Sequence, residues 1–166
     1  MKTALMPLMA AMACICTLAC GESAAPDLVF PDDYEWYADS ALGFRIAYPD
    51  HWDDNSPQTG SMDEMILGGA HFPALPDSIN AQLDITVFDS DYDLEQFRRD
   101  YGADEERIAG LTAYGTTRSF MGTMQRMVVF PGGGRYYFVQ CVADPEIFDD
   151  YGDIFDDIVG SFELIE

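Results

Sequence analysis

The sequence predicts one α+β domain behind an N-terminal export segment. A chain of 166 residues is long enough for a single domain with its own core. Its 48% hydrophobic content, with eleven Phe and nine Tyr, is typical of a globular protein and not of a disordered one. From about Tyr34 onward the chain consists of strand-like segments bounded by turn residues, with two helical segments among them. We therefore expect one core built from strands and two helices over residues 34–166.

Residues 1–19 form the predicted export signal. Lys2 supplies a positive start, and the stretch from Thr3 to Ala19 is apolar. A membrane-spanning helix needs about 20 apolar residues, so this shorter stretch is typical of a secretory signal that is removed. We expect the mature protein to be exported.

Cys20 is the residue for which we predict lipidation. The segment Thr17–Gly21 resembles the lipobox of bacterial lipoproteins, in which the cysteine is diacylated and becomes the new N-terminus. Thr17 departs from that motif, which usually has Leu there. Two acyl chains give stable anchoring, and residues 20–33 would form a polar tether. The expected location is the bacterial cell envelope, on a membrane and facing the periplasm or the exterior; the alternative is a secreted or periplasmic protein without lipid.

The first strand of the domain is predicted over residues 43–49. Apolar and polar or small residues alternate there, so Phe44, Ile46 and Tyr48 should face a core. Pro49 ends this strand, and we expect Trp52 to fold back over it.

The next region combines a loop with a clear strand. Residues 65–68 predict a short strand, and residues 70–78, which contain two prolines, predict a loop. Residues 83–88 alternate regularly and predict a strand. Its buried face should carry Leu83, Ile85 and Val87.

A short helix is predicted after Asp93. Asp93 is a good N-cap residue, and Gln96 follows three positions later, as in a capping box. The helix should end before Gly102, because glycine is the usual residue just beyond a helix C-terminus.

Three further strands are predicted over residues 111–120, 123–130 and 135–142. The Pro131–Gly134 run joins the last two and favours a hairpin turn over a phosphate-binding loop, because no Lys-Ser or Lys-Thr follows it. Cys141 lies in the last of these strands. We assign its thiol to the core, where a free cysteine behaves as a small hydrophobic residue.

The C-terminal helix is predicted from Asp144, a capping residue, with Pro145 in its first turn. Its apolar stripe consists of Ile147, Tyr151, Ile154 and Ile158, broadened by Phe148, Phe155 and Val159. Residues 161–165 should close the chain as a short extended segment.

Both ends of the predicted domain resemble the PsbP-like family. At the start, a Gly-Phe strand over residues 43–49 ends in Tyr-Pro before Trp52; near the end, residues 135–139 are similar to that family's last strand and residues 158–162 to its Ser-Phe finish. The resemblance covers about Trp36 to Leu164. It implies an antiparallel β-sheet flanked by helices, a PsbP-like α/β/α sandwich. It brings no catalytic residues, and the near absence of basic residues speaks against the photosystem binding of the plant subunit.

The charge of the chain restricts its partners. Thirty acidic and eight basic residues give a formal net charge of −22. Such a surface repels phosphate backbones, so we expect no binding of nucleic acid, and a charged partner should be a basic protein or a cation. The alternative is that the acidity serves solubility, for instance in a saline habitat.

One segment has the spacing of a calcium-binding loop. Asp89, Asp91 and Asp93 fall at its first, third and fifth positions, and Asp100 falls at the twelfth. Carboxylates with this spacing can converge on calcium, the one cofactor that the sequence suggests. Leu94 stands where such a loop needs Gly, so the alternative is a polar connection between a strand and a helix.

Other polar residues carry less specific signals. His51 and His71 stand in expected loops without the spacing of a transition-metal site. The last helix has an acidic face that consists of Asp149, Asp150, Asp153, Asp156 and Asp157. These like charges should make stability depend on salt. We find no nucleophile motif, dinucleotide motif or metalloprotease motif, and therefore expect no enzyme.

The leading functional hypothesis is a non-catalytic exported lipoprotein that presents a PsbP-like domain at the cell envelope for protein binding or assembly support. A calcium-binding module that uses Asp89, Asp91 and Asp93 is the alternative. A small hydrolase is the third possibility, without residues to support it. The expected partners are the membrane, through the lipid on Cys20, and a protein of basic character.

Overall fold

The computed structural model describes residues 33–56, 65–75 and 78–165. Six strands form a large antiparallel sheet in the order β3-β4-β8-β7-β6-β5, and three form a small antiparallel sheet in the order β1-β2-β9. The large sheet contains β3 (Ile66–Leu75), β4 (Ser78–Asp89), β5 (Asp104–Ile108), β6 (Leu111–Phe120), β7 (Thr123–Gly132) and β8 (Arg135–Ala143). The small sheet contains β1 (Tyr34–Asp39), β2 (Phe44–Pro49) and β9 (Glu163–Leu164), and the helices are α1 (Leu94–Tyr101) and α2 (Gly152–Gly160).

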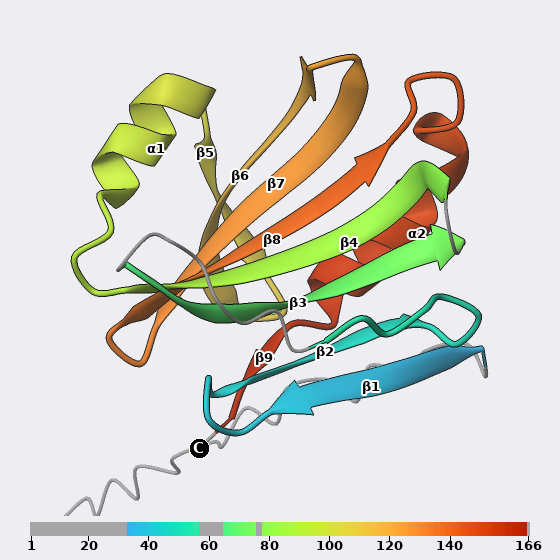
Figure 1. Cartoon of the computed structure of the whole chain (residues 1–166). Coiled ribbons are helices and arrows are strands. Elements are labelled where there is room, and N and C mark those ends of the chain that lie inside the picture. Colours follow the sequence, from blue (N-terminus) through green and yellow to red (C-terminus); the bar gives the residue numbers. More distant parts are fainter. Residues whose placement is uncertain (1–32, 57–64, 76–77, 166) are drawn as a thin grey trace, which may run out of the picture.

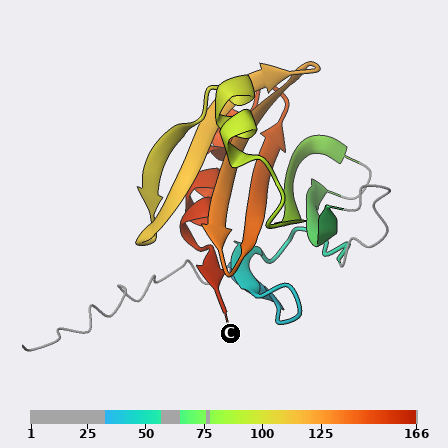
Figure 2. The same ribbon diagram turned by 90° about the vertical axis from the view of Figure 1, so that its left-hand side faces the viewer.

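The large sheet is the middle layer of the molecule. Helix α1 covers part of one face, and α2 with the small sheet covers the other (Figure 1, Figure 2). Side chains of β8 alternate between the two sides, because successive residues of a strand point to opposite faces: Val139 and Cys141 enter the main core, and Phe138 packs beside α1. This arrangement confirms the expected α+β fold of one domain, an antiparallel sheet flanked by helices.

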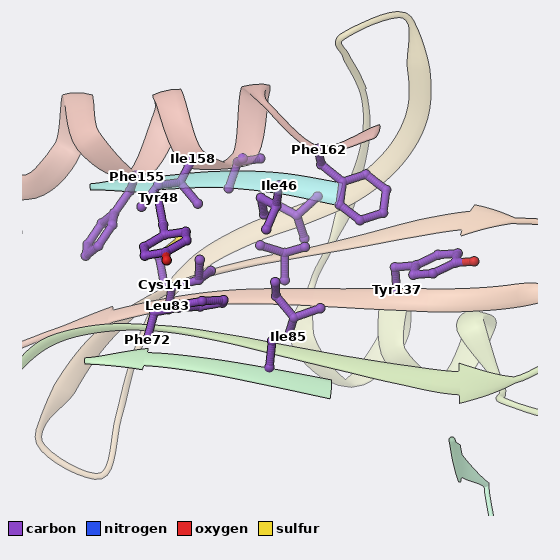
Figure 3. Close-up of a cluster of buried hydrophobic side chains, with 14 of the residues drawn as sticks. Ile46, Tyr48, Phe72, Leu83, Ile85, Tyr137, Cys141, Phe155, Ile158 and Phe162 are labelled. Carbon is purple, nitrogen blue, oxygen red and sulfur yellow. The ribbon is translucent and has the colours of Figure 1, made fainter. Parts of the chain in front are cut away.

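The main core lies between the large sheet and the layer of α2 and β2. Figure 3 shows Phe155 and Ile158 of α2 and Ile46 of β2 directed at Leu83 and Ile85 of β4. Each fully buried side chain of this kind stabilises the fold by about 1.5–3 kcal/mol. The inward faces expected for β2 and β4 are confirmed.

Trp52 and Cys141 also lie where the sequence placed them. Trp52 is 3% exposed, and its ring lies 6.3 Å from that of Tyr151. Cys141 is completely buried, and burial raises the pKa of its thiol, so the thiol stays protonated. The core position of Cys141 is confirmed, and Trp52 belongs to the same cluster of buried residues as Phe44, Ile46 and Tyr48 of β2.

The loop expected over residues 70–78 is wrong. Strand β3 runs through this region as Ile66–Leu75 and pairs with β4 along its length. Pro73 is tolerated because β3 is an edge strand of the large sheet, and a register shift follows between Pro73 and Leu75. Residues 76–77 lie outside the described ranges.

Helix α1 agrees with its prediction at both ends. The Asp93 side chain accepts a hydrogen bond of 2.8 Å from the Gln96 backbone N–H. Gly102 ends the helix with a φ of 65°, in the left-handed region, and its N–H bonds the Arg98 carbonyl oxygen. The cap and the stop are therefore both local properties of the sequence.

Strands β6, β7 and β8 form the expected meander. Gly133 and Gly134 make the turn between β7 and β8 with φ values of 56° and 75°, which suit a tight hairpin. Strand β5, which was not expected, precedes the meander and pairs with β6 through a second tight turn at Ala109–Gly110.

The C-terminal helix starts later than expected from Asp144. A turn and a 3-10 segment (Asp149–Tyr151) come first, and α2 begins at Gly152. Asp and Gly are poor helix formers, and Phe148 and Tyr151 both pack against Phe155, at 5.5 and 5.7 Å between ring centroids. Those contacts span seven and four residues, the spacing of neighbours on one helix face, so the 3-10 segment keeps the expected apolar stripe in line with α2. The closing extended segment is confirmed as β9, which pairs with β2.

Candidate functional site

The clearest candidate site is a hollow beside α1, which we call the acidic hollow. It encloses about 420 Å³. The chain segments that form it are the start of β3, the connection from β4 to α1, and one side of α1. Its lining consists of Met65, Asp91, Tyr92, Asp93, Gln96, Phe97, Asp100 and Tyr101.

The helix spacing explains why these side chains meet. Asp93, Gln96, Phe97 and Asp100 recur at intervals of three and four residues, which places them on one side of α1. Phe97 is buried and fixes that side of the helix against the sheet, with its ring 5.6 Å from Phe138 in an edge-to-face contact. The hollow therefore lies on a second, smaller cluster of buried residues, which consists of Phe97, Ala103, Met127 and Val129.

Aromatic rings form the apolar part of the hollow. Tyr101 stacks on Phe97 with 5.0 Å between ring centroids, and Tyr92 stacks on Phe88 at 4.4 Å. Burial, Tyr101 and then the carboxylate of Asp93 raise the pKa of Tyr92 to about 12. Its hydroxyl therefore stays neutral at physiological pH and can donate a hydrogen bond.

Three carboxylates form the polar rim. Asp93 accepts the N-cap bond through Oδ1, and Oδ2 of Asp100 accepts a hydrogen bond of 3.2 Å from Nε2 of Gln96. Asp91, Asp93 and Asp100 are all exposed to solvent, and none of the described lining residues is basic. The rim is therefore anionic.

This combination suits an organic cation. An ammonium or guanidinium group is attracted to the faces of aromatic rings, and carboxylates nearby add charge-assisted hydrogen bonds. The apolar stem of a lysine or arginine side chain can lie along the edges of the rings of Tyr92 and Tyr101, which stack on Phe88 and Phe97. The acidic hollow can thus accept a basic side chain from another molecule.

The predicted calcium loop lies partly in this hollow. The fold brings Asp91, Asp93 and Asp100 to the lining, whereas Asp89 accepts a hydrogen bond of 2.9 Å from the Ser90 hydroxyl at the end of β4. Within residues 33–56, 65–75 and 78–165, no three His, Cys, Asp or Glu side chains are grouped so that they could hold a metal ion. Calcium binding by Asp89, Asp91 and Asp93 stays a prediction.

The structure also pairs two residues that the sequence left apart. His71 lies in β3 and not in a loop, and its Nδ1 is 2.6 Å from Oδ1 of Asp84 on β4. Nε2 of Gln82 donates to the other oxygen of Asp84, also at 2.6 Å. A correct prediction of strand β3 would have placed His71 opposite Asp84, but Pro73 made residues 70–78 look like a loop. His51, by contrast, is exposed in the turn after β2.

The remaining candidates lie elsewhere. The five aspartates of the acidic face are exposed on the 3-10 segment and α2, opposite Phe155, Ile158 and Val159. Cys20 and the export signal lie outside the described residues. In the part of the chain that the structure describes, no helix is long and apolar enough to span a membrane.

Comparisons with known proteins identify the fold. No protein-family model matches the sequence, and no curated protein is significantly similar to it. The solution structure of cyanobacterial PsbP from Synechocystis is similar, with a TM-score of 0.58, 14% identity, and coverage of 87% of this chain and 99% of that one. A crystal structure from Bacteroides thetaiotaomicron has a TM-score of 0.55 and 11% identity over 80% of this chain and 48% of the other.

LpqN of Mycobacterium tuberculosis, described as involved in cell envelope biogenesis, has a TM-score of 0.44 and 16% identity over 80% of this chain and 92% of its own. That likeness is too low to compare the two folds further. The likeness to the Synechocystis protein concerns the fold alone, because functional residues are not carried over at so low an identity. The chain has a PsbP-like fold.

Proposed function

We propose that this protein is a non-catalytic, exported domain that docks a basic partner protein at the acidic hollow. A lysine or arginine side chain of the partner enters the hollow between Tyr92 and Tyr101. The carboxylates of Asp91, Asp93 and Asp100 hold its charge. Binding in this way requires no chemical step.

The observation that carries the proposal is the combination of rings and carboxylates in one hollow. Carboxylates are common on so acidic a chain, but Asp91 and Asp100 border a floor that includes the stacked pair of Phe97 and Tyr101. A hydrated calcium ion gains nothing from such a floor, because it prefers oxygen ligands throughout. A basic side chain can contact both the rings, through its apolar stem, and the carboxylates, through its charged group.

The charge of the whole chain supports the same class of partner. A net charge of −22 attracts a basic protein over a distance, and the hollow then fixes one of its side chains. The attraction should weaken as salt is added, because the Debye length is about 8 Å at physiological ionic strength.

The place of action that we propose is the bacterial cell envelope. The export signal and a lipid on Cys20 would hold the domain at a membrane surface, with residues 20–33 as its tether. A domain anchored in this way can keep a partner near the membrane or support an assembly there.

Calcium binding by the loop of Asp89, Asp91 and Asp93 is the second candidate, because two of these carboxylates, together with Asp100, line the same hollow. The two functions differ in what the rings do. A calcium site needs only the carboxylates, so Tyr101→Leu would leave it intact, whereas the same change should weaken the binding of a basic side chain.

The test is a titration monitored by amide NMR and calorimetry at physiological salt. The probe is the peptide acetyl-Lys-Gly-Lys-Gly-Lys-amide, with calcium chloride titrated separately. We expect saturable binding of the peptide with shifts confined to the hollow, and about tenfold weaker binding by Asp91→Asn/Asp100→Asn. Asp93 is left unchanged because it caps α1.

The matched control is Asp153→Asn/Asp156→Asn, which removes the same charge from the acidic face of α2. It should keep the affinity of the wild type to within about twofold. Equal losses in the two double variants would show that the peptide responds only to net charge. Saturable calcium heat that Asp91→Ala abolishes, without peptide binding, would favour the second candidate.

A further inference from the structure

The turn between β6 and β7 exposes two large apolar side chains. Met121 is 89% exposed and Phe120 is 46% exposed, in a two-residue turn made by Met121 and Gly122. Met121 has a φ of 50°, in the left-handed region that Asn or Gly occupies with less strain. We call Phe120 and Met121 the hairpin tip. Neither the turn nor the core of the domain explains why Met stands there.

Arg118 connects the hairpin tip to the acidic hollow. Its guanidinium carbon lies 5.0 Å from the ring centroid of Tyr101 and 5.5 Å from that of Phe120. Tyr101 is itself part of the lining of the hollow. The C-terminal end of α1 and the hairpin tip lie at the same end of the molecule (Figure 1, Figure 2). The two features therefore form one continuous surface.

The two parts of that surface differ in charge. Residues 107–143, which include the whole hairpin, contain four arginines and no Asp or Glu, in a chain with 30 acidic residues. Arg118 lies over the two rings and forms no ion pair with any residue that the structure describes. A basic side chain is therefore attracted to the carboxylate rim of the hollow, whereas an apolar side chain finds Phe120 and Met121 at the hairpin tip.

We propose that the hairpin tip is a second, apolar subsite of the docking surface. Its occupant is a segment of a partner protein in which an apolar residue lies beside the basic residue held in the hollow. The carboxylates of the hollow set the direction of the segment, because they hold its basic residue and residues 107–143, which contain the hairpin tip, have no Asp or Glu. This proposal rests on the proposed function and specifies the partner that the hollow accepts.

Two peptides of equal charge test the proposal. Acetyl-Lys-Gly-Lys-Gly-Lys-amide offers only basic side chains, and acetyl-Lys-Leu-Lys-Leu-Lys-amide adds apolar ones. We expect the leucine peptide to bind the wild type about tenfold more tightly, as the burial of one leucine side chain implies. Amide shifts of the leucine peptide complex should extend from the hollow to Phe120 and Met121.

The variant Phe120→Thr/Met121→Asn removes the apolar subsite and keeps the turn, since Asn suits the left-handed position and Thr suits a strand. It should bind both peptides with the affinity that the wild type has for the glycine peptide. The matched control is Leu67→Thr, which removes another exposed apolar side chain, 41% exposed, from β3. This control should keep the tenfold preference for leucine.

The outcomes separate the two proposals. Equal affinity of the wild type for both peptides would overturn the apolar subsite and leave the proposed function standing. Binding of neither peptide would overturn the proposed function and the subsite with it. Sedimentation of the wild type with phosphatidylcholine vesicles, lost in Phe120→Thr/Met121→Asn, together with equal peptide affinities, would show that the hairpin tip contacts a membrane instead.

Discussion

The Ser161 hydroxyl joins the end of α2 to the middle of β2 through the backbone of Ala47. Oγ of Ser161 accepts a hydrogen bond of 2.8 Å from the Ala47 N–H and donates one of 2.6 Å to the Ile158 carbonyl oxygen. Ser161 is completely buried, so both bonds lie away from water. The bond to Ala47 connects segments that are 114 residues apart in the sequence.

Ser161→Ala should therefore destabilise the domain. The change leaves the Ala47 N–H buried without its acceptor, which costs about 1–3 kcal/mol of unfolding free energy. Urea unfolding followed by circular dichroism measures the loss. Ser119→Ala, at an exposed position of β6, is the control and should change the free energy by less than about 0.5 kcal/mol. A cost below that value in Ser161→Ala would contradict the role given to this bond.

Gly115 should resist substitution because an ion pair crosses it. Arg126 donates two hydrogen bonds to Glu106, at 2.8 and 2.9 Å, from β7 to β5 across β6. A Cβ at Gly115 would collide with Oε1 of Glu106 and with the Arg126 guanidinium. Both colliding groups are the ends of flexible side chains and can move aside, so Gly115→Ala should cost about what the displaced ion pair contributes, on the order of 1 kcal/mol.

A double-mutant cycle checks the cause. In a Glu106→Ala background the collision with the carboxylate is gone, so Gly115→Ala should cost clearly less than it does in the wild type. Equal costs in both backgrounds would show that the ion pair is not what excludes a side chain at Gly115.

The charge at the end of α2 should limit stability at low salt. Asp157 stands near the C-terminus of this helix, where the helix dipole disfavours a negative charge. Asp157→Asn should raise the unfolding free energy by about 0.3–1 kcal/mol at low salt, and the gain should shrink as sodium chloride is added. Asp153→Asn is the matched control. Asp153 lies in the first turn, where the dipole favours its charge, so its loss should not stabilise the protein.

Tyr92 should ionise late as the pH rises. Its pKa in the folded protein is raised from 10.0 to about 12, so the folded state holds the phenolic proton more tightly than the unfolded chain does. The stability that this provides is complete below pH 10 and is lost as the pH rises toward about 12. The measurement is a pH titration followed by tyrosinate absorbance. Compared with the wild type, Tyr92→Phe should lack one tyrosine that ionises near pH 12. An unchanged titration would contradict the assignment.

Cys20 should carry the membrane anchor. The intact mass of the mature protein from membranes of an expressing bacterium should correspond to a diacylated Cys20 at the N-terminus. Cys20→Ala should lose both the lipid and the membrane fraction. An unlipidated mass in the soluble fraction of the wild type would show that the departure at Thr17 matters.

Local sequence signals predicted some elements completely. The Asp93 cap and the Gly102 stop define α1 because both act within a few residues. The alternation of apolar and polar residues predicted β2 and β4, because one face of each strand packs in the core. For the candidate site, the spacing of Asp91, Asp93 and Asp100 selected a segment that lines the acidic hollow, but it gave no sign of the aromatic rings beside these carboxylates.

Other elements depend on partners that are distant in the sequence. Strand β3 forms despite Pro73 because β4 is its only neighbouring strand among the residues that the structure describes; on the outer side, the carbonyl oxygens of His71 and Pro73 accept hydrogen bonds from Asn55 and Asp53. The pairing of His71 with Asp84 follows from that register and has no local signal. The later start of α2 has a local cause instead: Asp149, Asp150 and Gly152 are poor helix formers, and the chain forms a 3-10 segment before the α-helix begins.

By itself the sequence determined the charge of this protein, its α+β class and the position of α1, because these follow from composition and from contacts within a few residues. Only the tertiary structure decided that Met65 joins Tyr92 and Tyr101 around three carboxylates, and that Arg118 connects this hollow to the hairpin tip. The reason is physical: a site built from separate strands and a helix exists only once the sheet has brought their side chains within contact distance.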